Sequence, residues 1–146
     1  MPLIEKSVLV PFSAAKMYVL VEKVEDYPQF LPWCGGSAVN RLSADTIEAS
    51  IDIRFKGISQ RFTTINTLSP YERIDMALKE GPFSDLKGDW RFVALKEDAC
   101  KVEFHLDYHF SSRLLETLVG PVFHYIASTF VDCFTQRAFA LYSPAK

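Results

Sequence analysis

The sequence lacks the charge excess that marks several specialised classes of protein. Lys and Arg number 16 against 18 Asp and Glu, so there is no basic surplus of the kind with which free-standing nucleic-acid binders neutralise phosphates. We therefore expect no DNA partner, although a local basic patch is compatible with the net charge of -2. A hydrophobic fraction of 49% excludes an intrinsically disordered chain.

Cysteine is also scarce. The three cysteines, Cys34, Cys100 and Cys133, are odd in number and far apart, and no CxxC or Cys/His ladder occurs. Neither a disulfide framework nor a metal site is predicted. The first residues, MPLIEKSVLVPF, show neither a signal peptide's long apolar run nor the character of an organelle transit peptide. We therefore expect a reduced, cytoplasmic protein.

Aromatic residues, by contrast, are abundant. The 146 residues include 12 Phe, 6 Tyr and 2 Trp, and this length fits a single domain over residues 1–146. So many large, rigid side chains predict a broad apolar interior or a pocket lined by rings.

The first third of the chain predicts one strand and a broken helix. Leu3–Val10 has strand character, and Ser13 is placed to cap a helix over Ala14–Val24. Pro28 and Pro32 end that helix, and only a short helical turn is expected between them.

The middle of the chain predicts an antiparallel sheet. Apolar and polar residues alternate clearly in Ile47–Phe55 and in Lys101–Phe110, as in strands with one buried face. Lys56-Gly57 supplies a tight hairpin turn. About six strands are expected, five of which can be placed: Ile47–Phe55, Ile58–Leu68, Arg73–Glu80, Leu86–Ala94 and Lys101–Phe110.

The last segment predicts one long helix over Ser112–Tyr142, bent at Gly120-Pro121. A transmembrane span over Leu118–Phe134 is a poor alternative, because 17 residues is short and the segment contains His124 and Asp132. The pattern favours an amphipathic helix lying on the sheet, with a wide apolar arc that comprises Leu115, Leu118, Val119, Val122, Phe123, Ile126, Phe130, Cys133, Phe134 and Leu141. The expected fold class is α+β, a curved antiparallel sheet around one long helix, with a pocket or a filled core between them.

The candidates for catalysis are weak. His105 and His109 share the outer face of one strand, about 13 Å apart at 3.3 Å per residue, too far for easy chelation by that pair alone. His124, Ser128 and Asp132 form a string on one helical face, but a solvated face explains this pattern better than a catalytic site does. No phosphate-binding, zinc-protease or nucleophile-elbow motif occurs, so we expect a protein that is not an enzyme.

Candidates for ligand binding are stronger. Arg137 falls within the apolar arc of the last helix, where it extends to solvent, pairs with a carboxylate of the sheet or forms a polar handle at a pocket mouth. Trp33, Trp90, Phe83 and Phe92 are either plain core or ligand contacts.

Three segments carry a resemblance to a known family: VEDYPQFLPWC (Val24–Cys34), GPFSDLKGDWRF (Gly81–Phe92) and the stretch Val102–Ala138. They resemble the coenzyme Q-binding START-domain family, which includes the bacterial ribosome association toxin and sits in the polyketide cyclase/dehydrase-like group. The resemblance implies a helix-grip fold, with a hydrophobic tunnel between the sheet and the C-terminal helix.

The resemblance further implies a bound isoprenoid lipid such as ubiquinone, carried in support of respiration or quinone biosynthesis, with no other cofactor required. The alternative that it implies is binding to the large ribosomal subunit and inhibition of translation; for this, Arg54, Lys56 and Arg61 are the candidate basic patch. A bacterial protein in the cytoplasm, with peripheral membrane contact as a further alternative, fits both. The expected ligand contacts are Leu31, Trp33, Phe55, Phe83, Trp90, Phe92, Phe104, Val119, Phe123, Ile126, Phe130 and Arg137.

Overall fold

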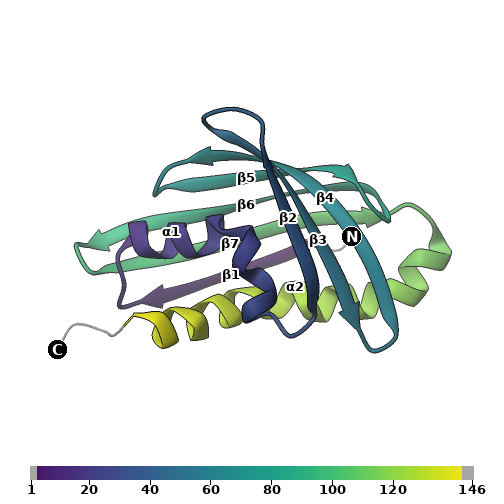
Figure 1. The fold of residues 1–146 in the computed structure, drawn as a ribbon. Helices are drawn as coiled ribbons and strands as arrows, with labels where there is room; N and C mark the ends of the chain where they lie inside the picture. The colour runs from purple at the N-terminus through teal and green to yellow at the C-terminus, as the bar shows by residue number, and fades with distance from the viewer. Residues whose placement is uncertain (1–2, 143–146) are drawn as a thin grey trace.

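The computed structural model describes residues 3–142, which form one antiparallel sheet and its helices. The elements follow the order β1 (Leu3–Val10), α1 (Ala14–Glu22), η1 (Val24–Gln29), β2 (Cys34–Arg41), β3 (Thr46–Phe55), β4 (Ile58–Ser69), β5 (Arg73–Glu80), β6 (Phe83–Lys96), β7 (Ala99–Phe110) and α2 (Arg113–Leu141). The sheet order is β1-β7-β6-β5-β4-β3-β2, so only β1 is out of sequence. Figure 1 shows β2–β4 running steeply across the direction of β5–β7, because the sheet is twisted and curled.

The helices begin and end near the residues that the sequence indicated. Ser13 accepts a hydrogen bond from the Lys16 backbone N–H at 3.1 Å and caps α1, and Ser112 caps α2 in the same way. The short helix is the exception. It is a 3₁₀ helix over Val24–Gln29 that contains Pro28, and it does not lie between the two prolines as expected. Pro28 is the fifth of its six residues, so the missing N–H removes at most one hydrogen bond near the end of this short helix.

The sheet confirms the five placed strands and adds β2. The turn at Lys56 and Gly57 has φ values of 50° and 81°, the left-handed pair that a two-residue hairpin requires. β6 extends beyond the predicted strand Leu86–Ala94 at both ends. Its first residue, Phe83, pairs with Phe110 of β7, and its last, Lys96, pairs with Ala99.

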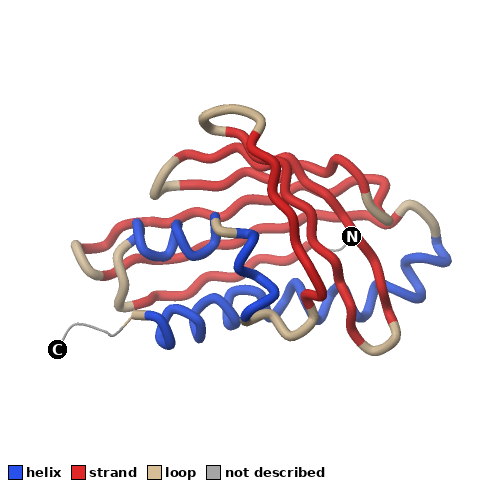
Figure 2. The backbone as a smooth tube through the Cα atoms, viewed as in Figure 1, coloured by secondary structure: helices blue, strands red, loops and turns tan. Residues whose placement is uncertain are grey.

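α1 and α2 lie on the same face of the sheet. Phe92 of β6 contacts Tyr18 of α1 at 5.8 Å, while Trp90, two residues earlier on the same face, contacts Phe134 of α2 at 5.2 Å. Figure 2 shows the helices, in blue, lying against the red strands. The buried residues of both helices and of the inward face of the sheet form one apolar core.

The apolar arc of α2 is narrower than the sequence indicated. Val119, Phe123, Ile126 and Phe134 are buried as expected. Leu118 and Leu141, assigned to the same arc, are 56% and 52% exposed. The helical wheel fixes a direction for each side chain, but it carries no information on how far round the helix the sheet reaches.

Candidate functional site

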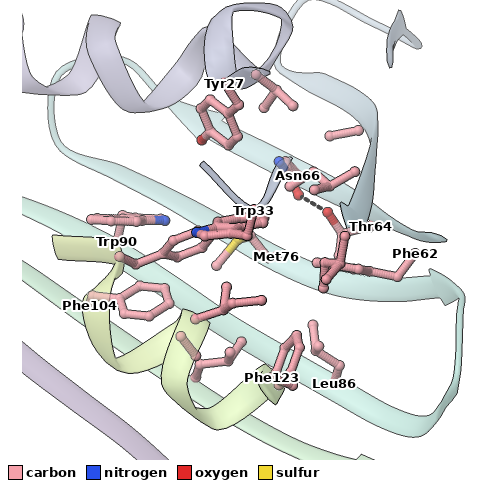
Figure 3. Close-up of a pocket in the computed structure, with 18 residues that line it drawn as sticks. Tyr27, Trp33, Phe62, Thr64, Asn66, Met76, Leu86, Trp90, Phe104 and Phe123 are labelled. Carbon is pink, nitrogen blue, oxygen red and sulfur yellow. Dashed lines mark hydrogen bonds between the residues drawn. The ribbon is translucent and has the colours of Figure 1, made fainter. Parts of the chain in front are cut away.

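A cavity of about 50 Å³ lies between α2 and the curled sheet. Figure 3 shows its lining, with Phe104 and Phe123 on one side and Tyr27 and Asn66 on the other. The lining residues come from η1, the turn before β2, strands β3–β7 and α2, and they are Val24, Tyr27, Trp33, Ala49, Ile51, Ile53, Phe62, Thr64, Asn66, Met76, Leu86, Trp90, Phe104, Leu106, Phe123, Ile126, Ala127 and Phe130. The wall is almost wholly apolar.

Trp33 contributes the most unusual group in this wall. Its side chain is 2% exposed, and its indole nitrogen has no hydrogen-bond partner among the described residues. The Arg54 backbone N–H donates to the Trp33 carbonyl oxygen at 2.8 Å, which fixes the residue against the end of β3. A buried N–H without an acceptor costs free energy, so a donor held in this way is a natural contact for a ligand oxygen.

Thr64 and Asn66 form a second polar feature in the wall. They occupy alternate positions of β4, opposite Ala49 and Ile47 of β3, and therefore face inward like Phe62. The Thr64 hydroxyl donates to the Asn66 side-chain oxygen at 2.7 Å, as Figure 3 shows. This pairing leaves the Asn66 amide group as the donor that the pair can offer to a third molecule.

Aromatic pairs hold α2 over the cavity. Phe130 contacts Trp33 at 5.2 Å between ring centroids, and Phe123 contacts Phe62 at 6.0 Å. On the sheet side, Trp90 and Phe104 lie 4.5 Å apart. The gap between α2 and the sheet is thus closed by side chains from both sides.

Burial changes the ionisation of the groups around the site. Burial raises the pKa of the Tyr27 phenol strongly, and its hydroxyl donates to the Val21 carbonyl oxygen. Burial also raises the pKa of the Cys34 thiol beside Trp33. Both groups therefore stay neutral at physiological pH, and the cavity presents no charge to a ligand.

The structure brings half of the expected ligand contacts together around the cavity. These are Trp33, Trp90, Phe104, Phe123, Ile126 and Phe130. The other six lie elsewhere: Leu31, Phe55, Phe83, Phe92, Val119 and Arg137.

The packing of these residues explains why they do not line the cavity. Phe83 is enclosed by Phe110 and Phe123 at 5.0 and 4.9 Å, and Phe92 lies under Tyr18 of α1. Leu31 and Val119 are ordinary core residues, exposed by 1% and 3%. Phe55 stacks on Tyr125 at the margin of the molecule.

Arg137 is not among the residues that line the cavity, and its buried Nε has no hydrogen-bond partner among the described residues. Its guanidinium donates to the Gln29 side-chain oxygen at 3.1 Å and lies 5.0 Å from the Phe30 ring centroid, so it ties the end of α2 to η1. A wheel places Arg137 in the apolar arc, but η1 covers that part of the arc.

Twelve of the eighteen lining residues were not among the expected ligand contacts, and three of these twelve carry polar groups: Tyr27, Thr64 and Asn66. The alternation of inward and outward residues along β4 could have indicated Thr64 and Asn66. Once Phe62 is assigned to the inner face, Thr64 and Asn66 follow at the next two inward positions, and polar residues there mark a lined space rather than plain core.

The histidines do not form a catalytic arrangement. His124 is exposed and its Nδ1 lies 3.5 Å from the Tyr108 hydroxyl, while Ser128 donates to the Tyr125 carbonyl oxygen instead of to His124. His105 lies on the outer face, 3.3 Å from Asp89 and 3.5 Å from Glu5. Over residues 3–142, no group of three or more His, Cys, Asp or Glu is placed to hold a metal ion.

Comparison with known proteins identifies the family. The sequence profile of the family described as "Polyketide cyclase / dehydrase and lipid transport" matches residues 10–135. The chain belongs to this family. It is 46% identical over 143 residues to "Persistence and stress-resistance toxin PasT" of Escherichia coli O6:H1, and 45% identical over 143 residues to "Ribosome association toxin RatA" of Escherichia coli K12. Each alignment covers 98% of this chain and 90% of the relative.

A more distant relative has a different name. The "Coenzyme Q-binding protein COQ10 homolog B, mitochondrial" of Xenopus laevis is 26% identical, over 94% of this chain and 58% of its own length. These three relatives are named as toxins and as a binding protein, and none is named as an enzyme.

Solved structures confirm the helix-grip fold. A START superfamily protein from Mycobacterium smegmatis superposes with a TM-score of 0.75 at 20% identity, over 96% of this chain and 99% of that one. The Zhui aromatase/cyclase from Streptomyces sp. R1128 superposes with a TM-score of 0.77 at 15% identity, over 94% and 93%. Since an enzyme shares this architecture, function must be argued from the site itself.

Proposed function

We propose that this protein binds an isoprenoid lipid, with ubiquinone as the leading candidate, in the cavity between α2 and the sheet, and that it carries the lipid without chemical conversion. The observation that supports this is the unpartnered indole N–H of Trp33, in a wall that is apolar apart from this donor and a few polar side chains such as Thr64 and Asn66. A quinone carbonyl oxygen is a suitable acceptor for that donor. The relative named as coenzyme Q-binding supports the same class of ligand.

The size of the cavity adds a requirement. A volume of about 50 Å³ equals roughly four water-sized spheres at about 10–15 Å³ each. A prenylated ring is larger, so loading requires α2 to move away from β3 and β4. The contacts that must part are side-chain contacts such as Phe62 with Phe123 and Trp33 with Phe130.

Lipid extraction and titration test this proposal. We expect mass spectrometry of the protein purified from its native host to detect an isoprenoid. We also expect calorimetric titration with a short-chain ubiquinone to show binding that Trp33→Phe weakens roughly fivefold, the effect of losing one hydrogen bond of about 1 kcal/mol. Arg137→Met, which changes a residue outside the cavity, serves as the control and should bind like the wild type. Absence of both a co-purified isoprenoid and measurable quinone affinity would refute the proposal.

A second function, association with the large ribosomal subunit, is favoured by the names of the relatives at 45–46% identity. Such a role places the protein in the cytoplasm and needs a cationic surface despite the net charge of -2. Arg54 and Lys56, at the β3–β4 hairpin, are exposed and make no ion pair with another residue in the range 3–142. Arg61, the third candidate, is paired with Asp52 at 2.8 Å and is less available.

Co-sedimentation with purified large subunits tests the second function. We expect binding at low salt that falls as salt rises, and that Arg54→Glu with Lys56→Glu abolishes. Lys87→Glu, at an exposed position on β6, is the matched charge reversal and should leave binding intact. Absence of the protein from the subunit fraction at low salt would exclude this function.

A further inference from the structure

The N-terminal half of α2 carries an apolar stripe that no part of the described chain covers. Leu114, Leu118 and Tyr125 are 67%, 56% and 55% exposed, and Pro121 between them is exposed as well. Their spacing of four, three and four residues places them along one line of the helix. From Leu114 to Tyr125 this line is about 16 Å long at 1.5 Å per residue.

The stripe continues onto the sheet through one aromatic pair. The rings of Phe55 and Tyr125 are stacked, with centroids 5.8 Å apart and an interplanar angle of 2°. Phe55 precedes the turn between β3 and β4, so the tip of that hairpin and the outer face of α2 form one surface. We call the set Leu114, Leu118, Pro121, Tyr125 and Phe55 the α2–hairpin surface.

Unpaired cations border this surface. Arg54, Lys56 and Arg113 are exposed, and none of them forms an ion pair with another described residue. Lys56 Nζ lies 5.5 Å from the centroid of the Phe55 ring. On the outer face of the sheet, by contrast, Arg73 is paired with Asp75 and Lys79 with Glu48.

The acidic residues of α2 lie away from the stripe or at its end. Glu116 lies about 200° round the helix from Leu114, at about 100° per residue. Asp132 lies on the line of the stripe but two turns beyond Tyr125, where the apolar residues have ended. The surface is therefore apolar at its centre and cationic at its border, on a chain whose net charge is -2.

The apolar centre and cationic border of this surface indicate what kind of partner it binds. Exposed leucines contribute affinity only to an apolar medium, while tyrosine and the long stems of Lys and Arg suit the boundary between headgroups and acyl chains. RNA would need a free aromatic face for base stacking, but Tyr125 covers one face of Phe55 and Lys56 lies against its ring. We propose that the α2–hairpin surface docks on a lipid bilayer that contains anionic headgroups.

This docking is peripheral. By length and composition alone α2 could cross a membrane, a test that the core helices of soluble proteins also pass. The opposite side of α2 is occupied, since Phe123 and Ile126 are 3% and 2% exposed and line the cavity. The helix therefore lies on the bilayer with one face and on the sheet with the other.

Vesicle flotation of the full chain tests the proposal. We expect the protein to float with vesicles of phosphatidylcholine mixed with phosphatidylglycerol, and much less with phosphatidylcholine alone. Leu114→Ser with Leu118→Ser should reduce the bound fraction at least tenfold, because the two largest apolar contacts are removed. Leu9→Ser with Leu95→Ser changes two leucines of similar exposure, 68% and 53%, on β1 and β6, and should float like the wild type.

Other occupants give distinct results. Absence of flotation with anionic vesicles would overturn the proposal. So would an equal loss of vesicle binding in the Leu114→Ser/Leu118→Ser variant and in the Leu9→Ser/Leu95→Ser variant. If the Leu114→Ser/Leu118→Ser variant instead dissociated a dimer that sedimentation velocity detects in the wild type, the surface would bind a second copy of the chain. If only the Arg54/Lys56 reversal mattered, and only for ribosomal subunits, the surface would belong to RNA. Neither result bears on quinone titration, which concerns the cavity.

Discussion

The Trp33 indole lies against Phe130 of α2, with ring centroids 5.2 Å apart and the planes tilted by 36°. This contact joins the turn before β2 to the helix that covers the cavity, so one residue both closes the site and carries its unpartnered donor. Packing and hydrogen bonding at Trp33 therefore have opposite effects on the stability of the empty protein. Two substitutions at this position separate them.

Trp33→Ala should lower the free energy of unfolding by about 3–5 kcal/mol, since it removes a large buried ring. Trp33→Phe keeps most of the ring contact and removes the unsatisfied N–H, whose burial costs about 1–3 kcal/mol. We expect the phenylalanine variant to stay within about 1 kcal/mol of the wild type. Urea unfolding of the ligand-free proteins measures both values. A phenylalanine variant as unstable as the alanine variant would show that the N–H is already paired in the empty protein.

The hydrogen bond between Thr64 and Asn66 predicts a strong coupling between these residues. Thr64→Val removes the donor and leaves the Asn66 oxygen buried without its partner, so we expect a loss of about 1–3 kcal/mol. Adding Asn66→Leu removes the orphaned group, so the double variant should lose less than the sum of the two single variants, by about 0.5–3 kcal/mol. Chemical denaturation of the wild type, the two single variants and the double variant measures this coupling energy. Additive losses would mean that the 2.7 Å contact contributes no stability.

The elements of this fold could be predicted because each one has a local cause. The alternation in Ile47–Phe55 and Lys101–Phe110, the caps Ser13 and Ser112, and the Lys56-Gly57 turn all act within a few residues. The 3₁₀ helix at Val24–Gln29 was misplaced, since proline marks only where an α-helix is disfavoured and leaves open which other turn replaces it.

The site was only half predictable, because it depends on curvature. Phe92 and Trp90 share one face of β6, yet Phe92 lies under α1 and Trp90 lines the cavity. A period of two residues gives the face of a side chain and not its position along a curled sheet. Arg137 lies outside the cavity lining for a similar reason, since contact with Gln29 and Phe30 of another segment decides its direction.

Gly88 should be sensitive to the smallest substitution. A Cβ atom at this position in β6 would lie 2.4 Å from the His105 carbonyl oxygen and 3.3 Å from the Leu106 Cα, both backbone atoms of β7. Because neither atom can move without distorting the strand pair, Gly88→Ala should cost about 1–3 kcal/mol or more.

Gly35→Ala is the matched control for Gly88→Ala. Its Cβ would also come close, at 2.5 Å, but to the side chain of the exposed Arg54, which can turn away. We expect a change within about 0.5 kcal/mol. Thermal unfolding of the two variants compares the costs, and equal losses would contradict the view that β6 and β7 are locked at Gly88.

The stability of the protein should fall at alkaline pH because buried acids resist ionisation. Cys100 is fully buried, and burial raises the pKa of its thiol to about 11 from an ordinary value of 9.0. Between these values the unfolded chain loses the proton while the folded chain keeps it, so rising pH favours unfolding. The contribution is complete below pH 9 and is lost as the pH rises towards 11. Burial raises the pKa of Tyr27 and of the Cys34 thiol in the same direction.

Urea midpoints measured across this range for the wild type and for Cys100→Ala isolate the thiol. The alanine variant starts from a lower stability because a side-chain atom is missing from the core, but its midpoint should fall less steeply above pH 9. Cys100 should also resist a thiol reagent at mildly alkaline pH until the protein unfolds, since the reactive thiolate is suppressed. Parallel curves for the two proteins, together with rapid modification of Cys100 in the folded state, would show that the thiol ionises inside the core.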